Sequence, residues 1–209
     1  MVQFNPINFI SKSFNLETKK NAPTTIASQN TIVEQSDDLD TFEFSTKNGE
    51  KFEDVFNEMR TNVPDRTTTI EEKELAIEYI DRMLACSDIS DDLKIYWQNK
   101  KEVIEMEIQN IKNEEKLRTG GESIDDVWKE FSAFTDRYFK LNDNLNFEDK
   151  FENRMTYYAT YKSFCLRFLA CEGLSDEQRA EYYRMMQNAD RDIANWIRDY
   201  NNYMRNENN

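Results

Sequence analysis

The sequence contains no histidine. Histidine is the commonest general base and the commonest neutral metal ligand in proteins, so its absence removes two large classes of functional site. A Ser-His-Asp triad, a histidine-containing zinc site and a di-iron site built on Glu-x-x-His are all impossible in this chain. The sequence also has no glycine-rich phosphate loop and no nucleophile elbow. We therefore expect no enzyme activity, no catalytic residue, no metal site and no cofactor.

Glycine and proline are also scarce, with four and three residues in a chain of 209. Beta sandwiches and barrels need many turns, where these two residue types concentrate, so the scarcity disfavours both architectures. Apolar residues make up only 38% of the chain, but the 13% that are aromatic bury a large area each. The composition therefore predicts an all-α protein with an aromatic core.

Long apolar runs are absent, and no stretch approaches the roughly 20 residues needed to span a bilayer. No positively charged start followed by an apolar segment marks a conventional secretory signal. The net charge of −14 disfavours binding to nucleic acid or to an anionic membrane surface. The three cysteines and the absence of an Asn-x-Ser/Thr sequon favour a reducing compartment. We expect a cytoplasmic protein, with export by a non-Sec route as the alternative.

Two short stretches recur in the same order along the chain. Residues 49–59 read GEKFEDVFNEM and residues 121–131 read GESIDDVWKEF, with five of 11 positions identical. Residues 81–92 read DRMLACSDISDD and residues 166–177 read LRFLACEGLSDE, with six of 12 identical. Gly49 thus matches Gly121 and Cys86 matches Cys171, and the second copy carries additional residues between its two stretches. We interpret this as an internal duplication of one helical unit, with chance resemblance between helix caps and amphipathic faces as the alternative.

Residues 1–48 differ in composition from the rest of the chain. The part from residue 17 onward is rich in Thr, Ser, Asn and Gln without helical periodicity, which predicts a flexible arm. Its apolar tip has three readings: a linear motif for a protein partner, an export signal, or a tail that docks on its own domain. The composition of the tip resembles that of some bacterial type III secretion leaders. The candidate binding residues of the tip are Phe4, Ile7, Phe9, Ile10 and Phe14.

Residues 49–117 are predicted to form a first repeat of three helices. Apolar side chains spaced i, i+3, i+4 and i+7 predict a helix from about residue 50 to residue 60. Thr69 and Glu72 have the spacing of a capping box and predict the start of the second helix. Ser90 is the predicted N-cap of the third.

Residues 121–205 are predicted to form a second repeat of three helices. The first begins after Ser123, and the second runs from about residue 147 to residue 171. Ser175 and Gln178 form a second predicted capping box, which begins the last helix. Sequence leaves open whether the two repeats share one core.

The last predicted helix carries an apolar seam with alternating steps of four and three residues, typical of coiled-coil packing. The matching seam of the first repeat is less apolar, with Lys101 in place of Met186 and Glu115 in place of Tyr200. We therefore expect the last helix either to run through the centre of both repeats or to offer its seam to another chain. The seam consists of Tyr182, Met186, Ala189, Ile193, Trp196, Tyr200 and Tyr203.

The cysteines are interpreted as buried packing residues. Cys86 and Cys171 occupy matching positions in the two repeats, and Cys165 lies about two turns earlier in its helix. No Cys-x-x-Cys spacing supports a metal site. A redox pair or a site for a soft metal is the alternative interpretation.

Adjacent carboxylates and clustered aromatics also have a structural interpretation and a functional one. Each acidic pair follows a serine N-cap, where the helix dipole favours it, although such pairs also bind hard cations or act as acid and base. The aromatics have the helical spacing of a core, with a pocket for an apolar or cationic ligand as the alternative. The acidic pairs are Asp91 with Asp92 and Asp176 with Glu177, and the aromatics are Trp128, Phe131, Tyr157, Tyr158 and Tyr161.

Arginine recurs every seven residues along the last predicted helix, at Arg184, Arg191, Arg198 and Arg205. Relative to the apolar seam these positions face outward. One interpretation is solubility with local pairing to aspartates of the same helix. The other is a docking face for an acidic protein, since the guanidinium fork engages a carboxylate through two hydrogen bonds.

Taken together, these patterns predict a non-enzymatic adaptor that binds a protein through the apolar tip, through the outer arginines, or through both. One candidate partner is a second copy of the chain, bound through the last helix as a homodimer. The alternative function is a secreted effector or a phage-encoded host-directed factor, including an acidic mimic of nucleic acid, with the arm as its export signal.

Overall fold

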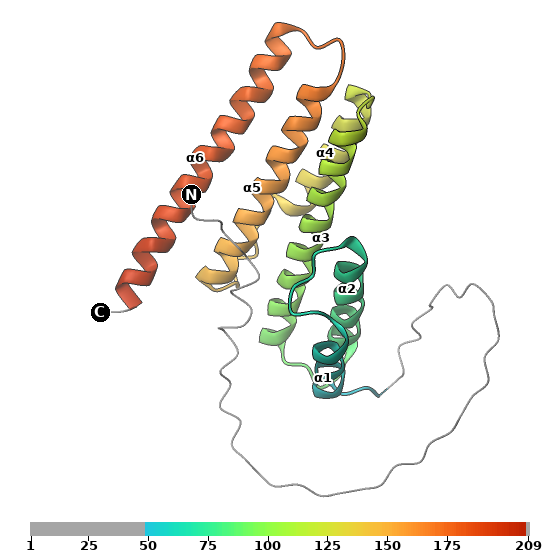
Figure 1. Ribbon diagram of the computed structural model, residues 1–209. Helices are drawn as coiled ribbons and strands as arrows, with labels where there is room; N and C mark the ends of the chain where they lie inside the picture. Colours follow the sequence, from blue (N-terminus) through green and yellow to red (C-terminus); the bar gives the residue numbers. More distant parts are fainter. Residues whose placement is uncertain (1–48, 208–209) are drawn as a thin grey trace, which may run out of the picture. The chain divides into compact units, whose positions relative to one another are not determined.

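The computed structural model describes residues 49–207. The predicted flexible arm and its apolar tip lie outside these residues, so both stay predictions. Every regular element in the described part is a helix, which confirms the all-α fold class (Figure 1). None of these helices combines the length and apolar composition that crossing a bilayer requires. The helices are α1 (Phe52–Asn62), α2 (Ile70–Ala85), α3 (Asp91–Thr119), α4 (Ile124–Tyr138), α5 (Phe147–Ala170) and α6 (Asp176–Glu207).

The helices begin where capping chemistry predicts. The Thr69 hydroxyl accepts from the Glu72 N–H, and the Glu72 carboxylate accepts from the Thr69 N–H, which confirms the capping box of α2. Ser175 and Gln178 make the same reciprocal pair of bonds at the start of α6. Helix α3 ends at Thr119, and its C-cap is Gly120, whose positive φ of 67° suits glycine and no other common residue.

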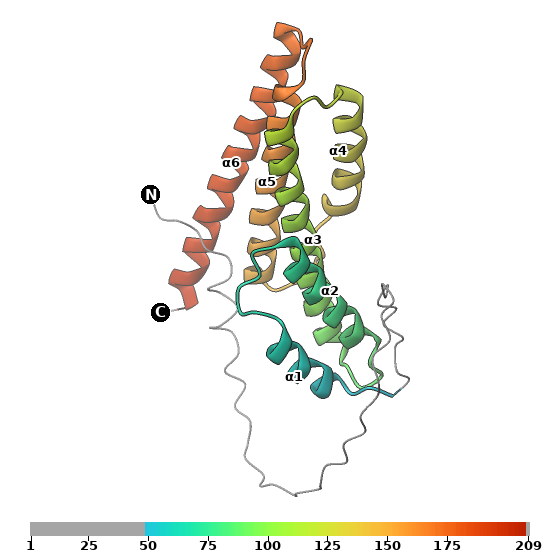
Figure 2. The same ribbon diagram turned by 45° about the vertical axis from the view of Figure 1, so that its right-hand side comes forward.

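Four helices pack one against the next, α2 on α3, α3 on α5 and α5 on α6 (Figures 1 and 2). Helix α1 lies on α2, and α4 lies on α5 in the same way. Ion pairs from Lys73 to Glu107 and from Lys101 to Asp81 show that α2 and α3 run antiparallel. Helix α3 is thus covered on two sides, whereas α6 packs mainly on α5.

The apolar seam of α6 packs within the chain, on α5, and at its start the Tyr182 ring stacks on Phe168 at 4.6 Å. The Phe151 ring stacks on Tyr200 at 4.3 Å, and the Phe147 ring stacks on Tyr203 at 4.9 Å. The prediction that this seam runs through the centre of both repeats was therefore wrong, and its contact with another chain stays a prediction. The more polar α3 is the central helix instead, because its polar side chains find partners on α5.

Buried apolar side chains form two clusters, and α3 contributes to both. One cluster joins α1, α2 and Trp97 of α3. The other joins α4, α5 and the start of α6 with Val103 and Met106 of α3. Trp97 and Val103 lie on different faces of α3, so this helix connects the two clusters.

Candidate interaction surface

Helices α3 and α5 run parallel, and polar contacts fix their register. Three hydrogen-bonded pairs, each separated by 54 residues, recur at steps of seven along both helices. Such seven-residue steps keep two helices in contact along their whole length. The pairs are Asn99 with Asn153 at 2.8 Å, the Met106 carbonyl with Thr160 at 3.0 Å, and Asn113 with Arg167 at 2.7 Å.

Arg167 is the most buried charge in the described part of the chain, with a side chain that is 0% exposed. Its guanidinium donates two hydrogen bonds to Glu122, at 2.8 and 2.5 Å, and one to Glu130 at 2.8 Å. Hydrogen bonds from Arg167 lower the pKa of Glu122 below its ordinary value. Because a buried charge needs several partners, this cluster ties α5 to α4 and to the loop before it.

Arg82 makes the matching contacts near the start of the described chain. It donates to Glu50 at 2.8 Å and to Glu58 at 2.8 Å, which are the positions that match Glu122 and Glu130. Other contacts recur in the same way. The Arg82 guanidinium lies 5.1 Å from the centre of the Tyr79 ring, and Arg167 lies 5.2 Å from the matching Phe164 ring. The contact of Lys73 with Glu107 is matched by that of Tyr158 with Asp192. The ring contact of Phe56 with Trp97 is matched by that of Trp128 with Tyr182.

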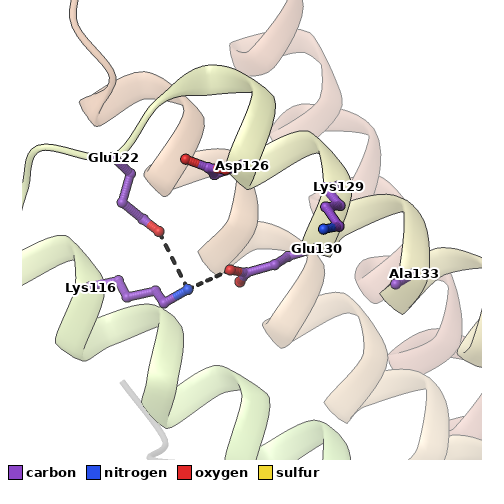
Figure 3. A pocket seen from close by; sticks show the side chains of 6 residues that line it. All are labelled: Lys116, Glu122, Asp126, Lys129, Glu130 and Ala133. Atoms are coloured by element: carbon purple, nitrogen blue, oxygen red, sulfur yellow. Dashed lines mark hydrogen bonds and ion pairs between the residues drawn. The ribbon is translucent and has the colours of Figure 1, made fainter.

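An open depression of about 440 Å³ lies between the end of α3 and helix α4 (Figure 3). The Lys116 ammonium lies 2.5 Å from Glu130 and 3.4 Å from Glu122. The same two carboxylates are the partners of Arg167, so their charges are balanced within the chain. We interpret the depression as the outer side of a structural ion cluster. Its lining residues are Lys116, Glu122, Asp126, Lys129, Glu130 and Ala133.

The cysteines are buried and free, as expected of packing residues. The thiols of Cys86 and Cys171 donate to the carbonyls of Arg82 and Arg167, at 3.3 and 3.4 Å. Burial raises the pKa of Cys165 to about 12, which leaves almost no reactive thiolate at neutral pH. These contacts favour the packing interpretation over a redox pair.

The acidic pairs and the aromatic cluster lie where a structural role explains them. Both acidic pairs occupy the first turns of α3 and α6, and the described residues contain no group of three candidate metal ligands. Phe131 and Tyr157 are core residues, and Tyr158 and Tyr161 pack against that core. Trp128 is 40% exposed, and its ring lies 4.7 Å from the ring of Phe168.

The four arginines of α6 that recur every seven residues, from Arg184 to Arg205, are exposed, on the side opposite the seam that packs on α5. The side chains of Arg184 and Arg198 are each 65% exposed. We call Arg184, Arg191 and Arg198 the arginine face. Seven-residue steps keep these three side chains on one line along the helix.

Local pairing holds only part of the arginine face. Arg184 pairs with Glu181, and Arg198 pairs with Asp199 at 3.2 Å, both between exposed groups of the same helix. Asp190 pairs with Lys162 of α5, and Arg191 has no ion-pair partner within residues 49–206. Exposed pairs of this kind contribute little to stability and are readily exchanged for other partners.

The arginine face corresponds to the most buried side of α3. In the alignment that matches Cys86 with Cys171, the two helices correspond position by position. The positions of α3 that face α5 are Asn99 at 3% exposure, Val103 at 4%, Met106 at 0% and Asn113 at 0%. The matching positions of α6 are Arg184, Asn188, Arg191 and Arg198, and all four are exposed. The side of α3 that packs on α5 is buried, whereas the matching side of α6 is exposed to solvent.

Sequence reasoning singled out the arginines of α6 but not Arg167, Asn113 or their carboxylate partners. A signal for Arg167 was present, because the arginine and both glutamates are identical in the two matched stretches. Comparison with protein family models, curated proteins and solved structures found no significant match for this chain.

Proposed function

We propose that this protein is a non-enzymatic interaction module that binds an acidic surface of a protein partner through the arginine face of α6. The observation that supports it is a line of exposed arginines on a chain of net charge −14, at positions whose counterparts on α3 are buried against another helix. Aligned guanidinium groups bind carboxylates strongly and in a defined geometry. Opposite net charges of the two surfaces would also speed their association.

We also infer that α1–α3 and α4–α6 are copies of one ancestral unit. The recurring contacts of Arg82 and Arg167 support this, since they join identical residues at matching positions. The inference explains why one helix face is buried in the first unit and open in the second: the second unit has no following unit within residues 49–207.

The remaining parts of the proposal rest on sequence. The apolar tip, from Phe4 to Phe14, is proposed as a second binding element, and its removal by deletion of residues 1–16 tests it separately. The odd number of cysteines and the absence of sequons support a cytoplasmic location.

The proposal is tested by affinity capture of partners from native lysate with the full chain and a charge-reversed variant. Arg191→Glu with Arg198→Glu should remove salt-sensitive partners, because like charges then face the acidic surface. The matched control is Lys129→Glu with Lys140→Glu, which makes the same charge change on exposed positions outside α6. Retention of every partner by the α6 variant would exclude the arginine face as the binding site.

A further inference from the structure

The outer side of α2 corresponds to the side of α5 that holds α3. In the same alignment, Thr160 of α5 matches Leu75 of α2, and Arg167 matches Arg82. On α5 this side is buried beneath α3, and Thr160 and Ser163 are closed off from solvent. On α2 much of the same side is open: Glu71 and Glu78 are exposed, and Leu75 between them is half-buried. Arg82, at the end of this side, is largely covered, with a side chain that is 12% exposed.

Apart from Arg82, which is paired with Glu50 and Glu58, the charged side chains on this side of α2 are negative. Glu71 and Glu78 lie two turns apart, and Leu75 stands between them. We call these three residues the acidic face. Within residues 49–206 neither Glu71 nor Glu78 has an ion-pair partner, and the neighbouring Glu74 adds a further negative charge. The acidic face therefore offers unpaired carboxylates at the spacing of helical turns.

Within the chain, α3 packs on α5. The arginine face of α6 matches the side of α3 in that contact, and the acidic face of α2 matches the side of α5. In that contact, residues at steps of seven on α3 meet residues at steps of seven on α5. Transferred to the open faces by the alignment, Arg191 comes opposite Leu75, with Glu71 and Glu78 on either side of it. Arg198 comes beside Glu78 and opposite Arg82, whose own charge is already balanced by Glu50 and Glu58. The arginine face and the acidic face carry opposite charges and attract each other. Two arginine faces, or two acidic faces, would repel each other.

We propose that the arginine face of one molecule packs on the acidic face of α2 of a second molecule, in the parallel arrangement that α3 and α5 adopt within the chain. The partner of the arginine face is then a second copy of this protein. This inference rests on the proposed function, since it names the acidic surface to which the arginine face binds. Guanidinium groups and carboxylates would pair across the contact, around the apolar stems of the arginines and Leu75.

Such a contact is heterologous, because the two faces that meet are different. A complex of two molecules therefore still leaves one arginine face and one acidic face open. Association therefore continues from copy to copy and gives linear chains or closed rings, whereas packing of α6 on α6 would stop at a symmetric dimer. This difference makes the proposal testable by the size of the complexes alone.

The first experiment measures the mass of the full chain by light scattering after size-exclusion chromatography, from about 5 µM to about 500 µM, the range of weak to moderate association. We expect the mean mass to rise beyond that of a dimer, and to fall in high salt. Glu71→Lys with Glu78→Lys, and separately Arg191→Glu with Arg198→Glu, should each weaken association more than tenfold. A control with Glu115→Lys and Asp136→Lys makes the same charge change at exposed sites outside both faces and should behave as the wild type.

The second experiment mixes the two charge-reversed variants. The α2 variant keeps its arginine face and the α6 variant keeps its acidic face, so the mixture should form complexes that neither protein forms alone. Circular dichroism of each variant checks that it is folded. Rescue on mixing supports a contact between the two faces and cannot arise from unfolding.

Two results would overturn the inference. One is a chain that stays monomeric at every concentration, which would leave a different protein as the partner of the arginine face. The other is an α2 variant that still associates as the wild type does, which would indicate packing of α6 on α6. In either case the capture from lysate still tests the proposed function separately. If the α6 variant fails to capture a protein other than this one that the wild type captures, the proposed function stands although the inference fails.

Discussion

At the scale of single residues, Arg82 and Arg167 occupy matching positions in the two halves of the described chain but differ in how far they are buried. Arg167 is closed off from solvent, whereas the Arg82 side chain is 12% exposed. Both hold two glutamates, but Arg167 also donates to Asn113 of the central helix. A fully buried charge depends on all its partners, since water cannot replace any of them.

Replacing each arginine by methionine should therefore have unequal effects. Arg167→Met should lower the free energy of unfolding by about 3 kcal/mol, because it removes the buried guanidinium that binds Glu122, Glu130 and Asn113. Lys116 and Gln109 still donate to these groups but replace only part of the lost hydrogen bonds. Arg82→Met should lower it by about 1 kcal/mol, since Glu50 and Glu58 are partly hydrated. Urea unfolding of both variants measures the difference. Equal losses would show that Arg167 is not more important to stability than its counterpart.

At the scale of helices, the position of each element decides its exposure more than its composition does. Helices α3 and α6 are the two longest in the described part, and both begin with a serine N-cap followed by two acidic residues. Helix α3 is held by α2 and α5, whereas α6 packs mainly on α5. Local opening is easier where fewer contacts must break.

Amide hydrogen exchange should report this difference. At a concentration where light scattering finds a monomer, residues 184–198 of α6 should exchange at least about tenfold faster than the matching residues 99–113 of α3. The helical hydrogen bonds are alike in both segments, so only tertiary packing distinguishes them. Equal protection in dilute solution would mean that a further contact holds α6.

At the scale of the whole molecule, the two apolar clusters are linked through α3 and its polar contact with α5. Arg167 and its partners connect α3, α4 and α5 in one network. Met106 belongs to the second cluster although it comes from α3, whose Trp97 belongs to the first cluster. We therefore expect residues 49–207 to unfold in one cooperative transition.

The three tryptophans allow this to be measured. Trp97 reports on the first cluster and Trp128 on the second. In each variant that keeps only one of these tryptophans, with the others replaced by phenylalanine, the fluorescence transition in urea should coincide with the loss of circular dichroism. A fluorescence transition displaced from the circular dichroism curve would show that the two clusters unfold independently.

Much of the helical structure followed from the order of residues alone. Capping boxes at Thr69 and Ser175 predicted where α2 and α6 begin, because an N-cap satisfies backbone N–H groups within a few residues of itself. Apolar periodicity similarly predicted which side of each helix is buried, since the helical repeat fixes which residues share a face. Local chemistry of this kind does not depend on the rest of the fold.

Only the tertiary structure decided which helix is central. The apolar seam of α6 suggested a central place, yet α3 holds it, with Asn99 and Asn113 almost closed off from solvent. A buried asparagine looks like a surface residue in sequence, because its partner on α5 is 54 residues away. The arginines of α6 likewise stood out as a docking face only once the structure showed that α3 buries the matching side. The exposure of a helix side depends on which element packs against it and not on its residues alone.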